Sequence, residues 1–492
     1  MTTAVQRRVA WVLAAALACS YAYFYQAGGW NQNSRFALVR AIVEQGTLTI
    51  DETGFVNGEP VTGDIARHDG HAYSDKAPGL ALTAVPVVAA LRPLIDQPRS
   101  ARGIARLSYL TTVVISAGAT VGAAVLLFFV ALSLGASGAA ATFAALVFGL
   151  GSPAFAYATL FYGHALATCC LAAAFAAATA LASRSSRRRD IILSLVVGIG
   201  GGWATVTEYP SVIPAAAIAC LAVWHSRLDH PRLVRVLAYV SIGALACAAA
   251  LAWFNAASFG SPVRIGYQAE VDFEGMQEGF FGLTSPRRGP LQELLFGSFR
   301  GLFFYAPVLA AACVGLLWLI RSRASRAPGV TAATIAVYYV LFNASYHYWD
   351  GGWSYGPRHM APVVWFLALA LAPVWCGVGR WLRVGLVAAA AYGGLLALMA
   401  VAVTAQPPDT YRHPLTELYL PLFLDGEVAH NWQSYLERLP MEQRDRQTHA
   451  WNLGEKAGLT GLPSLVPLIG LWFLGAIAWR RVTNGDHRPR GR

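Results

Sequence analysis

Residues 107–135 read LSYLTTVVISAGATVGAAVLLFFVALSLG and contain no charged side chain. A helix needs about 20 apolar residues to cross the hydrocarbon core of a bilayer, so this run is long enough. Comparable runs follow at residues 164–183, 234–257 and 384–405. Such continuous runs indicate helices, because the strands of a membrane barrel alternate between apolar and polar residues. The sequence therefore predicts an all-α protein that crosses the membrane several times.

The overall composition supports the same prediction. The 492 residues are 56% apolar and 13% charged, whereas soluble globular chains carry about 25% charged residues. The net charge of +11 comes from arginines that cluster beside apolar runs, as the cytoplasmic anchors of membrane helices do. We therefore expect membrane lipids around the chain and no nucleic acid partner.

The seven cysteines all fall inside apolar runs. Cysteine in such a setting is typically a small buried hydrophobic residue. The sequence therefore predicts neither a disulfide framework nor a metal-binding cysteine cluster.

The arginine clusters predict how the chain crosses the membrane. They lie at residues 7–8, 184–189, 227–235, 321–326, 380–383 and 480–481, and short basic loops face the cytoplasm. Two apolar runs separate each arginine cluster from the next. The exception is an odd number of apolar runs between the first cluster and the second. The weakest of these is residues 79–95, with two prolines, which we predict to be a juxtamembrane or re-entrant helix on the outer side.

This pattern predicts about 12 transmembrane helices, with both termini in the cytoplasm of a cell whose inner or plasma membrane holds the protein. We expect one transmembrane domain over residues 1–492. It has outer regions at 27–106 and 258–300, and a small outer subdomain at 405–462. Of the 26 Asp and Glu residues, only Asp190, Asp229 and Asp486 fall on the cytoplasmic side. Any acid–base chemistry is therefore expected outside.

The first outer region begins with a predicted helix over residues 34–45, capped by Asn33 or Ser34 and ended by Gly46. Arg35 would lie in the first turn of this helix, where the helix dipole disfavours a positive charge. Either an anionic group lies nearby, or the side chain extends to the membrane surface. The sequence leaves both explanations open.

Residues 72–79 read AYSDKAPG, and Lys76 is one of only two lysines in the chain. A lysine can bind phosphate as a compact point charge, or it can contact lipid headgroups without specificity. Asp75 beside it can hold its charge or act as a base or ligand. Asp64, further upstream, is either another candidate base or a turn residue after Gly63.

Other candidate residues lie at the outer ends of later helices. Glu208 would be costly in hydrocarbon, so we expect it to face a cavity or a partner. His164 starts an apolar helix and is either a functional donor, ligand or base, or a structural residue. Arg358 and His359 also open an apolar helix, and helix N-termini bind phosphate; the alternative role for them is an interfacial anchor.

The first outer loop resembles that of the GT-C superfamily of integral membrane glycosyltransferases. It is most similar to the group that contains the lipid A aminoarabinose transferase and the protein O-mannosyltransferase-like enzymes. Their loop reads roughly Asp-Glu-x-Arg-Tyr and then Tyr-Phe-Glu-Lys-Pro-Pro; this chain has QNSRF at 32–36 and YSDKAP at 73–78. The resemblance implies a GT-C-like fold, with Lys76 near the phosphate of a polyprenyl-phosphate sugar donor.

The chain departs from that pattern at the catalytic carboxylate, where Asn31, Gln32 and Asn33 stand. An amide cannot deprotonate an acceptor hydroxyl. The candidate bases are therefore Asp64, Asp75 and Glu208. The candidates for binding the phosphate or the donor are Lys76, Arg358, Arg35, His164 and His359.

We accordingly predict a membrane glycosyltransferase that moves a sugar from a polyprenyl-phosphate carrier to a glycan, lipid or protein acceptor on the outer face. No cofactor and no metal ligand is assigned, although a divalent cation remains an option. The alternatives are a transporter or flippase of a lipid-linked or anionic substrate, and a GT-C-like protein without catalytic activity.

Overall fold

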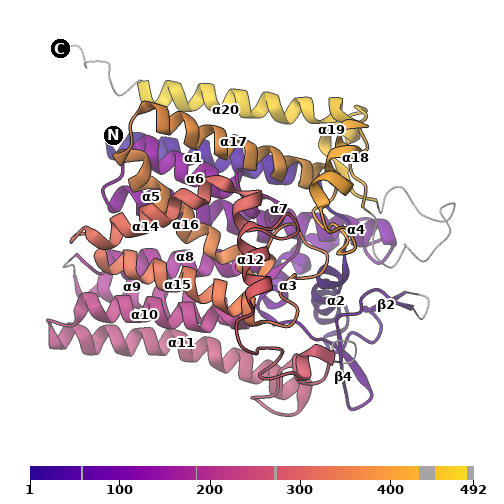
Figure 1. Ribbon diagram of the computed structural model, residues 1–492. Coiled ribbons are helices and arrows are strands. Elements are labelled where there is room, and N and C mark those ends of the chain that lie inside the picture. Colours follow the sequence, from indigo (N-terminus) through magenta and orange to yellow (C-terminus); the bar gives the residue numbers. More distant parts are fainter. Residues whose placement is uncertain (57–58, 184–185, 271–273, 432–448, 485–492) are drawn as a thin grey trace.

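The computed structural model describes residues 1–56, 59–183, 186–270, 274–431 and 449–484. Long helices run side by side through the molecule, and short helices and hairpins gather at one end (Figure 1). Nine helical segments of the described chain are long and apolar enough to cross a membrane. They contain α4 (Ala101–Thr112) with α5 (Gly118–Ser133), α8 (Gly163–Ala180), α9 (Arg187–Thr207), α10 (Val212–Ser226), α11 (His230–Phe259), α15 (Arg326–Ser345), α16 (Ala361–Gly377), α17 (Arg380–Val403) and α20 (Val466–Asn484).

Three further helices run alongside these segments: α1 (Thr3–Ala22), α6 (Gly138–Gly149) and α14 (Ala312–Arg321). By length and composition only the nine segments of the described chain qualify as candidate spans, and α1, α6 and α14 are not among them, so the prediction of about twelve crossings stays untested. With the nine segments, the protein is an all-α polytopic membrane protein, as the sequence predicts.

The short elements include two helices of the first outer region, α2 (Trp30–Gln45) and α3 (Gly79–Leu91). Short helices elsewhere are α7 (Ala154–Ala158), α12 (Arg288–Phe296), α13 (Leu302–Tyr305), α18 (Leu420–Leu424) and α19 (Leu453–Lys456). The strands pair antiparallel: β1 (Phe24–Tyr25) with β6 (Trp451–Asn452), β2 (Phe55–Val56) with β3 (Glu59–Pro60), and β4 (Ile65–His68) with β5 (His71–Ser74). Part of the outer subdomain expected over 405–462 lies outside the described residues.

Helix α3 occupies the apolar segment that the sequence predicts not to cross. Its 13 residues extend for about 20 Å, whereas the hydrocarbon core is about 30 Å thick. Leu80, Ala84 and Val88 of α3 are buried in a hydrophobic cluster with residues of α2. The two helices therefore form one packed unit at the outer end of the bundle, which can hold the loop between them in a fixed place.

Helix α2 begins earlier than the sequence indicates. Its first residue is Trp30 and its N-cap is Gly29, so neither Asn33 nor Ser34 caps it. The Asn33 amide instead donates to the carbonyls of Gly28 and Val61. Arg35 consequently lies beyond the first turn of α2. The helix dipole therefore does not account for the anionic partner of Arg35. The predicted end is correct, because Gly46 adopts a left-handed conformation with φ of 70°.

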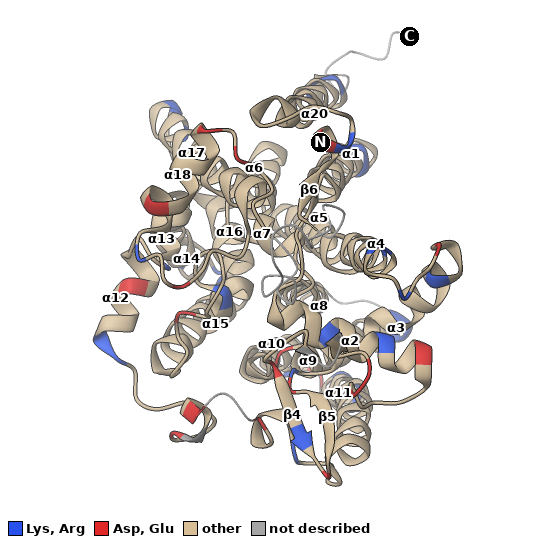
Figure 2. Cartoon of the chain, turned by 90° about the vertical axis from the view of Figure 1, so that its right-hand side faces the viewer, with Lys and Arg blue, Asp and Glu red and all other residues tan. Residues whose placement is uncertain are grey.

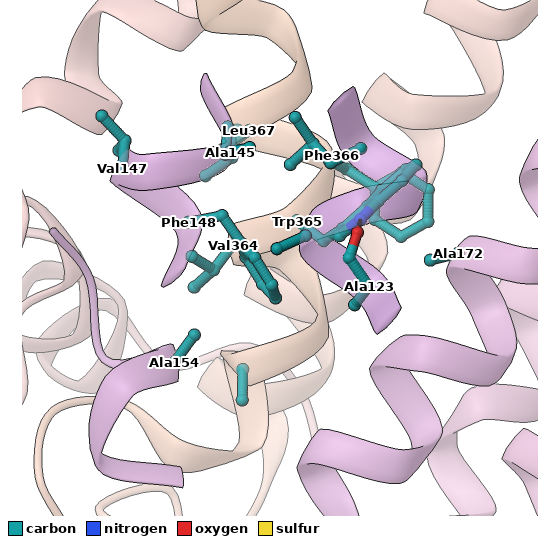
Figure 3. Packing of buried hydrophobic residues seen from close by; sticks show 14 of the residues in the cluster. Ala123, Ala145, Val147, Phe148, Ala154, Ala172, Val364, Trp365, Phe366 and Leu367 are labelled. Carbon is teal, nitrogen blue, oxygen red and sulfur yellow. Dashed lines mark hydrogen bonds between the residues drawn. The ribbon is translucent and has the colours of Figure 1, made fainter. Parts of the chain in front are cut away.

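Helix α16 lies in the middle of the bundle, and nearly all its side chains are buried. Figure 3 shows Val364, Trp365 and Phe366 of this helix packed against residues of neighbouring helices. The indole of Trp365 donates a hydrogen bond of 2.8 Å to the carbonyl of Ala123, which satisfies its polar atom in the apolar core. Packing on all sides fixes the position of α16 and therefore of the loop that precedes it.

The cysteines differ from the expectation of burial. All seven are free thiols, as predicted, but Cys19, Cys220, Cys313 and Cys376 are exposed on the protein surface, and only Cys247 is buried. The reason is that an apolar residue on the outside of a membrane bundle faces lipid, so an apolar run does not require burial within the protein.

A group of buried charges joins the beginnings of α9 and α11, at the end of the bundle opposite to the hairpins (Figure 1). Asp190 is 1% exposed, and its carboxylate accepts hydrogen bonds from Arg232 at 3.0 and 3.1 Å and from Arg235 at 3.2 Å. Arg232 also donates to the carbonyls of Leu181 and Ser183. The charges of this group thus pair with one another and with the end of α8.

Candidate active site

A cavity of about 500 Å³ lies at the end where the short elements gather. Figure 2 looks onto this end and shows acidic and basic residues around the first outer region. The ionisable residues that line the cavity are Arg35, Asp64, Lys76, Tyr162, His164, Glu208, Tyr267, Glu270, Tyr346, Tyr348, Asp350, Arg358, His359 and Asp409. A second hollow of about 320 Å³ at the opposite end has an almost wholly apolar lining. The cavity of about 500 Å³, called the outer cavity after the predicted orientation, is therefore the candidate active site.

The structure brings all but one of the sequence-predicted site residues to this cavity. The exception is Asp75, which is completely buried behind the wall and does not line the cavity. It is held there because the backbone of Gly266 packs directly against it: a Cβ atom at Gly266 would lie 2.5 Å from the Asp75 carbonyl oxygen. Asp75 can therefore influence the site only through its neighbours.

Arg35 and Glu208 form an ion pair that joins α2 to the end of α9. The guanidinium lies 2.9 Å from the Glu208 carboxylate and also donates to the Asn31 side chain and the Ala77 carbonyl. Glu208 is thus the anionic group expected near Arg35. Burial raises the pKa of Glu208, and the charge of Arg35 opposes that rise. With all its donor groups engaged, Arg35 is mainly a structural clamp.

The amide side chains that stand in place of the expected catalytic carboxylate hold the loop in its conformation. Gln32 accepts a hydrogen bond of 2.9 Å from the backbone of Phe161 and donates to the carbonyl of Ala27. Neither Gln32 nor Asn33 lines the cavity, whereas Asn31 does. The first block of the loop therefore offers amides for positioning, and the carboxylates of the cavity come from other segments.

Lys76 lies between two carboxylates. Its ammonium is 2.7 Å from Asp75 and 3.3 Å from Asp64. Burial alone would lower the pKa of Lys76, but the two carboxylates outweigh burial and hold the pKa well above its usual value. Lys76 therefore remains charged, and its charge is balanced by protein groups rather than left for a ligand.

Asp64 is the carboxylate of this group that reaches the cavity. It directly precedes β4, and its backbone is fixed by hydrogen bonds with Ser34 and Thr62. Burial raises the pKa of Asp64, and the charge of Lys76 opposes that rise. A carboxylate with a raised pKa and an exposed edge in a cavity has the properties of a general base.

Arg358 differs from the other two cations of the cavity. Among the residues that the structure describes, no carboxylate oxygen lies within 4.0 Å of its guanidinium, and its Nε atom is buried without a hydrogen-bond partner. The side chain packs on Gly351 and lies 5.8 Å from the ring centre of Tyr162. Arg358 also begins the short 3-10 turn Arg358–Met360 that leads into α16, and backbone N–H groups at the start of a helix favour anions. This is the arrangement of a binding site for an anionic group.

The two histidines complete the wall beside Arg358. The rings of His164 and His359 are 6.1 Å apart. His164 Nδ1 lies 3.7 Å from Glu208, whereas the Nε2 atom of His359 is buried without a partner. His359 hydrogen-bonds to the backbone of Tyr348. His359 thus lines the cavity with one ring nitrogen that no described residue satisfies.

Several lining residues were not identified from the sequence. Glu270 comes from the loop before α12, Asp350 from the loop before α16, and Gln406 and Asp409 from the loop after α17. Only the fold brings these loops together, so local sequence signals do not identify them. The one available signal is the acidic and aromatic composition of the loop that contains Glu270, which suits sugar binding but is also typical of a membrane interface, and which indicates no single residue.

Three carboxyl groups converge in one place within the described chain: oxygen atoms of Asp64, Asp75 and Glu270 lie within 4.8 Å of one another. Oxygen donors of this kind suit hard divalent cations. The ammonium of Lys76, however, already contacts the oxygens of Asp64 and Asp75. We therefore assign none of the three as a metal ligand, and the divalent cation considered from the sequence stays an untested prediction.

No protein-family model matches the chain, and no curated protein sequence is similar to it. Among solved structures, it is similar to ArnT from Cupriavidus metallidurans, whose crystal structure contains undecaprenyl phosphate. The TM-score is 0.52 at 14% identity, and the match covers 97% of this chain and 77% of ArnT. This likeness shows that the chain has the GT-C fold.

A second similar structure is the archaeal oligosaccharyltransferase AglB from Archaeoglobus fulgidus, in complex with an inhibitory peptide and a dolichol-phosphate. Here the TM-score is 0.47 at 13% identity, and the match covers 80% of this chain. The chain spans only 56% of the length of AglB.

Proposed function

We propose that the protein is a glycosyltransferase that takes a sugar from a polyprenyl-phosphate carrier and transfers it to an acceptor hydroxyl in the outer cavity. The two similar structures contain undecaprenyl phosphate and dolichol-phosphate, and the GT-C fold is shared. The acceptor is a hydroxyl of a glycan, lipid or protein.

The observation that carries this proposal is that Arg358 has no carboxylate partner among the described residues. A guanidinium within a cavity requires an anionic partner, since removing an uncompensated charge from water is costly. Arg35 and Lys76 have partners within the protein, whereas Arg358 has none among the described carboxylates. A phosphate held by Arg358 would supply that partner, and arginine is suited to phosphate geometry.

Asp64 is the base in this proposal. It accepts the proton of the acceptor hydroxyl while the hydroxyl oxygen forms a bond to the anomeric carbon of the donor sugar. The bond between that carbon and the phosphate oxygen breaks, and the electron pair leaves with the polyprenyl phosphate. Arg358 stabilises the negative charge that develops on the phosphate. Lys76 lies beside Asp64 and favours its ionised form.

The position of the cavity favours transfer over transport. A transporter places its substrate site near the middle of the membrane, whereas this cavity lies at the end of the bundle among juxtamembrane elements. The arginine clusters at the opposite end indicate that the cavity faces outward. Thiol labelling of cysteines introduced at Arg287 and Arg288 tests this orientation, since only an external reagent is expected to reach them.

The activity is tested with purified protein and a polyprenyl-phosphate sugar whose lipid part is labelled. We expect release of polyprenyl phosphate that depends on an added hydroxyl acceptor. Arg358→Ala should lower the rate about 100-fold, as the loss of one stabilising donor does in other transfer reactions. Arg323→Ala is the matched control, because Arg323 is exposed beyond α14, away from the cavity.

Two results would overturn the proposal. One is the absence of release with every carrier sugar tested, although the protein is folded and binds the carrier; the protein would then be a GT-C-like binding protein. The other is release that is the same in wild type and Arg358→Ala, which would remove the assigned role of Arg358.

A further inference from the structure

Glu270 reaches the pair of Lys76 and Asp75 from a different loop. The loop pairs with β4 through a bridge between Ala66 and Glu270 and through a 2.9 Å hydrogen bond from the backbone of Arg67 to the carbonyl of Ala269. Gly266 of the same loop packs on the backbone of Asp75. The backbone therefore holds the Glu270 carboxyl group beside Asp75 by contacts on both sides.

If Asp64, Asp75, Glu270 and Lys76 were all ionised, these four groups together would carry more negative than positive charge. Oxygen atoms of Asp64, Asp75 and Glu270 lie within 4.8 Å of one another, and the ammonium of Lys76 is the cation that contacts Asp64 and Asp75. Carboxylates so close to one another in a buried site do not all ionise, and one of them holds a proton.

The ion pairs and hydrogen bonds of the three carboxyl groups indicate which of them holds the proton. Asp64 and Asp75 each have an ion pair with Lys76, whereas Glu270 has no ion pair within the described residues. The Oδ1 atom of Asp75 is buried without a donor, and the Glu270 carboxyl group lies within hydrogen-bonding reach of the Asp75 side chain. Two carboxyl groups can share a hydrogen bond only when one of them carries the proton.

We propose that Glu270 is a carboxylic acid that donates its proton in a hydrogen bond to Asp75. In this form the group contains two carboxylates and one ammonium, and Lys76 stays close to Asp64. Ionised Glu270 would add a third negative charge and compete with Asp64 for the ammonium of Lys76. Glu270 is thus a positioning residue that keeps Lys76 beside the proposed base, and this role rests on the proposed function.

The surroundings of Glu270 fit a retained proton. Burial and then the negative charge of Asp75 are the main causes that raise the pKa of Glu270 to about 10. The other titratable groups that face it are Asp64, Lys76 and the phenols of Tyr267, Tyr346 and Tyr348, with Arg67 and His68 further along β4. Of these, Lys76 is the cation that would promote ionisation of Glu270.

The direction of the pH effect follows from this pKa. The folded protein binds the proton more tightly than the unfolded chain, so the stabilisation is complete at pH values below the pKa of an unfolded glutamate. It is lost progressively as the pH rises towards 10. A glutamine at this position retains an N–H donor and does not titrate, so Glu270→Gln should remove this dependence.

Infrared spectroscopy of the full-length protein in an ester-free detergent tests the proton directly. At pH 8 we expect a C=O band of a protonated carboxylic acid that is present in the wild type and absent in Glu270→Gln. Glu274→Gln is the control, because Glu274 is exposed in the same loop, and it should keep the band. A band unchanged by Glu270→Gln would overturn the proposal, and so would its disappearance on addition of Mg²⁺, since a cation would then have replaced the proton.

The positioning role is tested by the pH profile of sugar transfer. The wild type should lose activity as Glu270 ionises near pH 10, whereas Glu270→Gln should stay active at pH 8 and lack this decrease. Glu270→Ala should lose most of the activity, with unfolding temperatures measured for all variants. An unchanged alkaline decrease in Glu270→Gln would contradict the role. If no variant transfers sugar, the proposed function fails, and the infrared result still decides the protonation of Glu270.

Discussion

The protein buries charged groups at both ends of its helix bundle, and the two sites differ in how completely the charges are paired. Where α9 and α11 begin, Asp190 accepts hydrogen bonds from Arg232 and Arg235, and Arg232 also binds backbone carbonyls. These residues line neither the cavity beside the hairpins nor the apolar hollow at the opposite end. At the end with the hairpins, Arg358 has no carboxylate partner among the described residues, and Nε2 of His359 has no hydrogen-bond partner among them.

The difference separates a structural use of charge from a functional one. A buried charge that is paired with an opposite charge of the protein needs no further molecule, whereas a cation that has no carboxylate partner beside a cavity needs one. The comparison predicts that changes at Asp190 and Arg232 alter stability, and that changes in the outer cavity alter transfer. The following predictions test that division, from the largest expected effect to the smallest.

Asp64→Asn should lower turnover about 1,000-fold, because an amide cannot take the acceptor proton. The carrier should bind nearly as well as before, so the loss should appear in kcat. Steady-state kinetics with varied carrier concentration measures this. Asp69→Asn is the control, since Asp69 is exposed in the turn between β4 and β5 and asparagine tolerates its positive φ. If Asp64→Asn turns over normally while Glu208→Gln does not, the base is Glu208.

Arg232→Met should lower the free energy of unfolding by about 3–5 kcal/mol, because Asp190 would lose its main partner in a buried site. Thermal unfolding in detergent measures the loss. The rate of transfer per folded molecule should remain that of the wild type, since the site lies at the other end of the bundle. A fall in kcat beyond the loss of folded protein would show that the two charged sites are not independent.

Arg300→Lys should raise the KM for the carrier about tenfold, the effect of losing a hydrogen bond to a charged donor. Arg300 is fully buried and donates to the carbonyls of Asp350 and Gly352 at 2.8 and 2.6 Å. It thereby fixes the loop that lies against Arg358, and one ammonium cannot make both contacts. Arg412→Lys is the control, because Arg412 is exposed and stacks on Phe299, as Arg300 does. Equal KM values in the two variants would contradict a role for Arg300.

Gly351→Ala should weaken carrier binding severalfold, whereas Gly352→Ala should not. Both glycines have positive φ, of 75° and 60°, so an alanine at either costs about 1 kcal/mol of backbone strain. Only at Gly351 would the new Cβ also meet Arg358, at 2.8 Å from its Cγ. Comparing carrier affinity between the two variants isolates the displacement of Arg358. Equal affinities would show that the exact position of this side chain is unimportant.

Much of the fold could be predicted from the sequence, because a bilayer imposes simple rules. Apolar runs indicate helices, and the requirement for an even number of crossings predicts that α3 does not cross. The start of α2 could not be predicted, since Asn33 looks like a helix cap but binds Gly28 and Val61 instead. That choice depends on Val61, which the fold brings near.

The site could be predicted only in part. Arg358 and Glu208 stand out because charge beside an apolar helix is costly. The pairing of each charge could not be predicted: Lys76 looked like the phosphate-binding residue, yet two carboxylates surround it. Glu270 was missed because its role depends on contact with Asp75, which is distant in sequence. Sequence reasoning thus identifies costly charges but not which of them remain without a partner.

The most direct test of the comparison is the affinity of the purified protein for undecaprenyl phosphate and for undecaprenol. Wild type and Arg323→Gln should bind the phosphate form more tightly than the alcohol, by a factor of about 10 or more, because a hydrogen-bonded charge pair forms. In Arg358→Gln this difference should disappear while the affinity for the alcohol is unchanged. A phosphate preference that persists in Arg358→Gln would contradict the central claim that Arg358 is the cation left for the carrier.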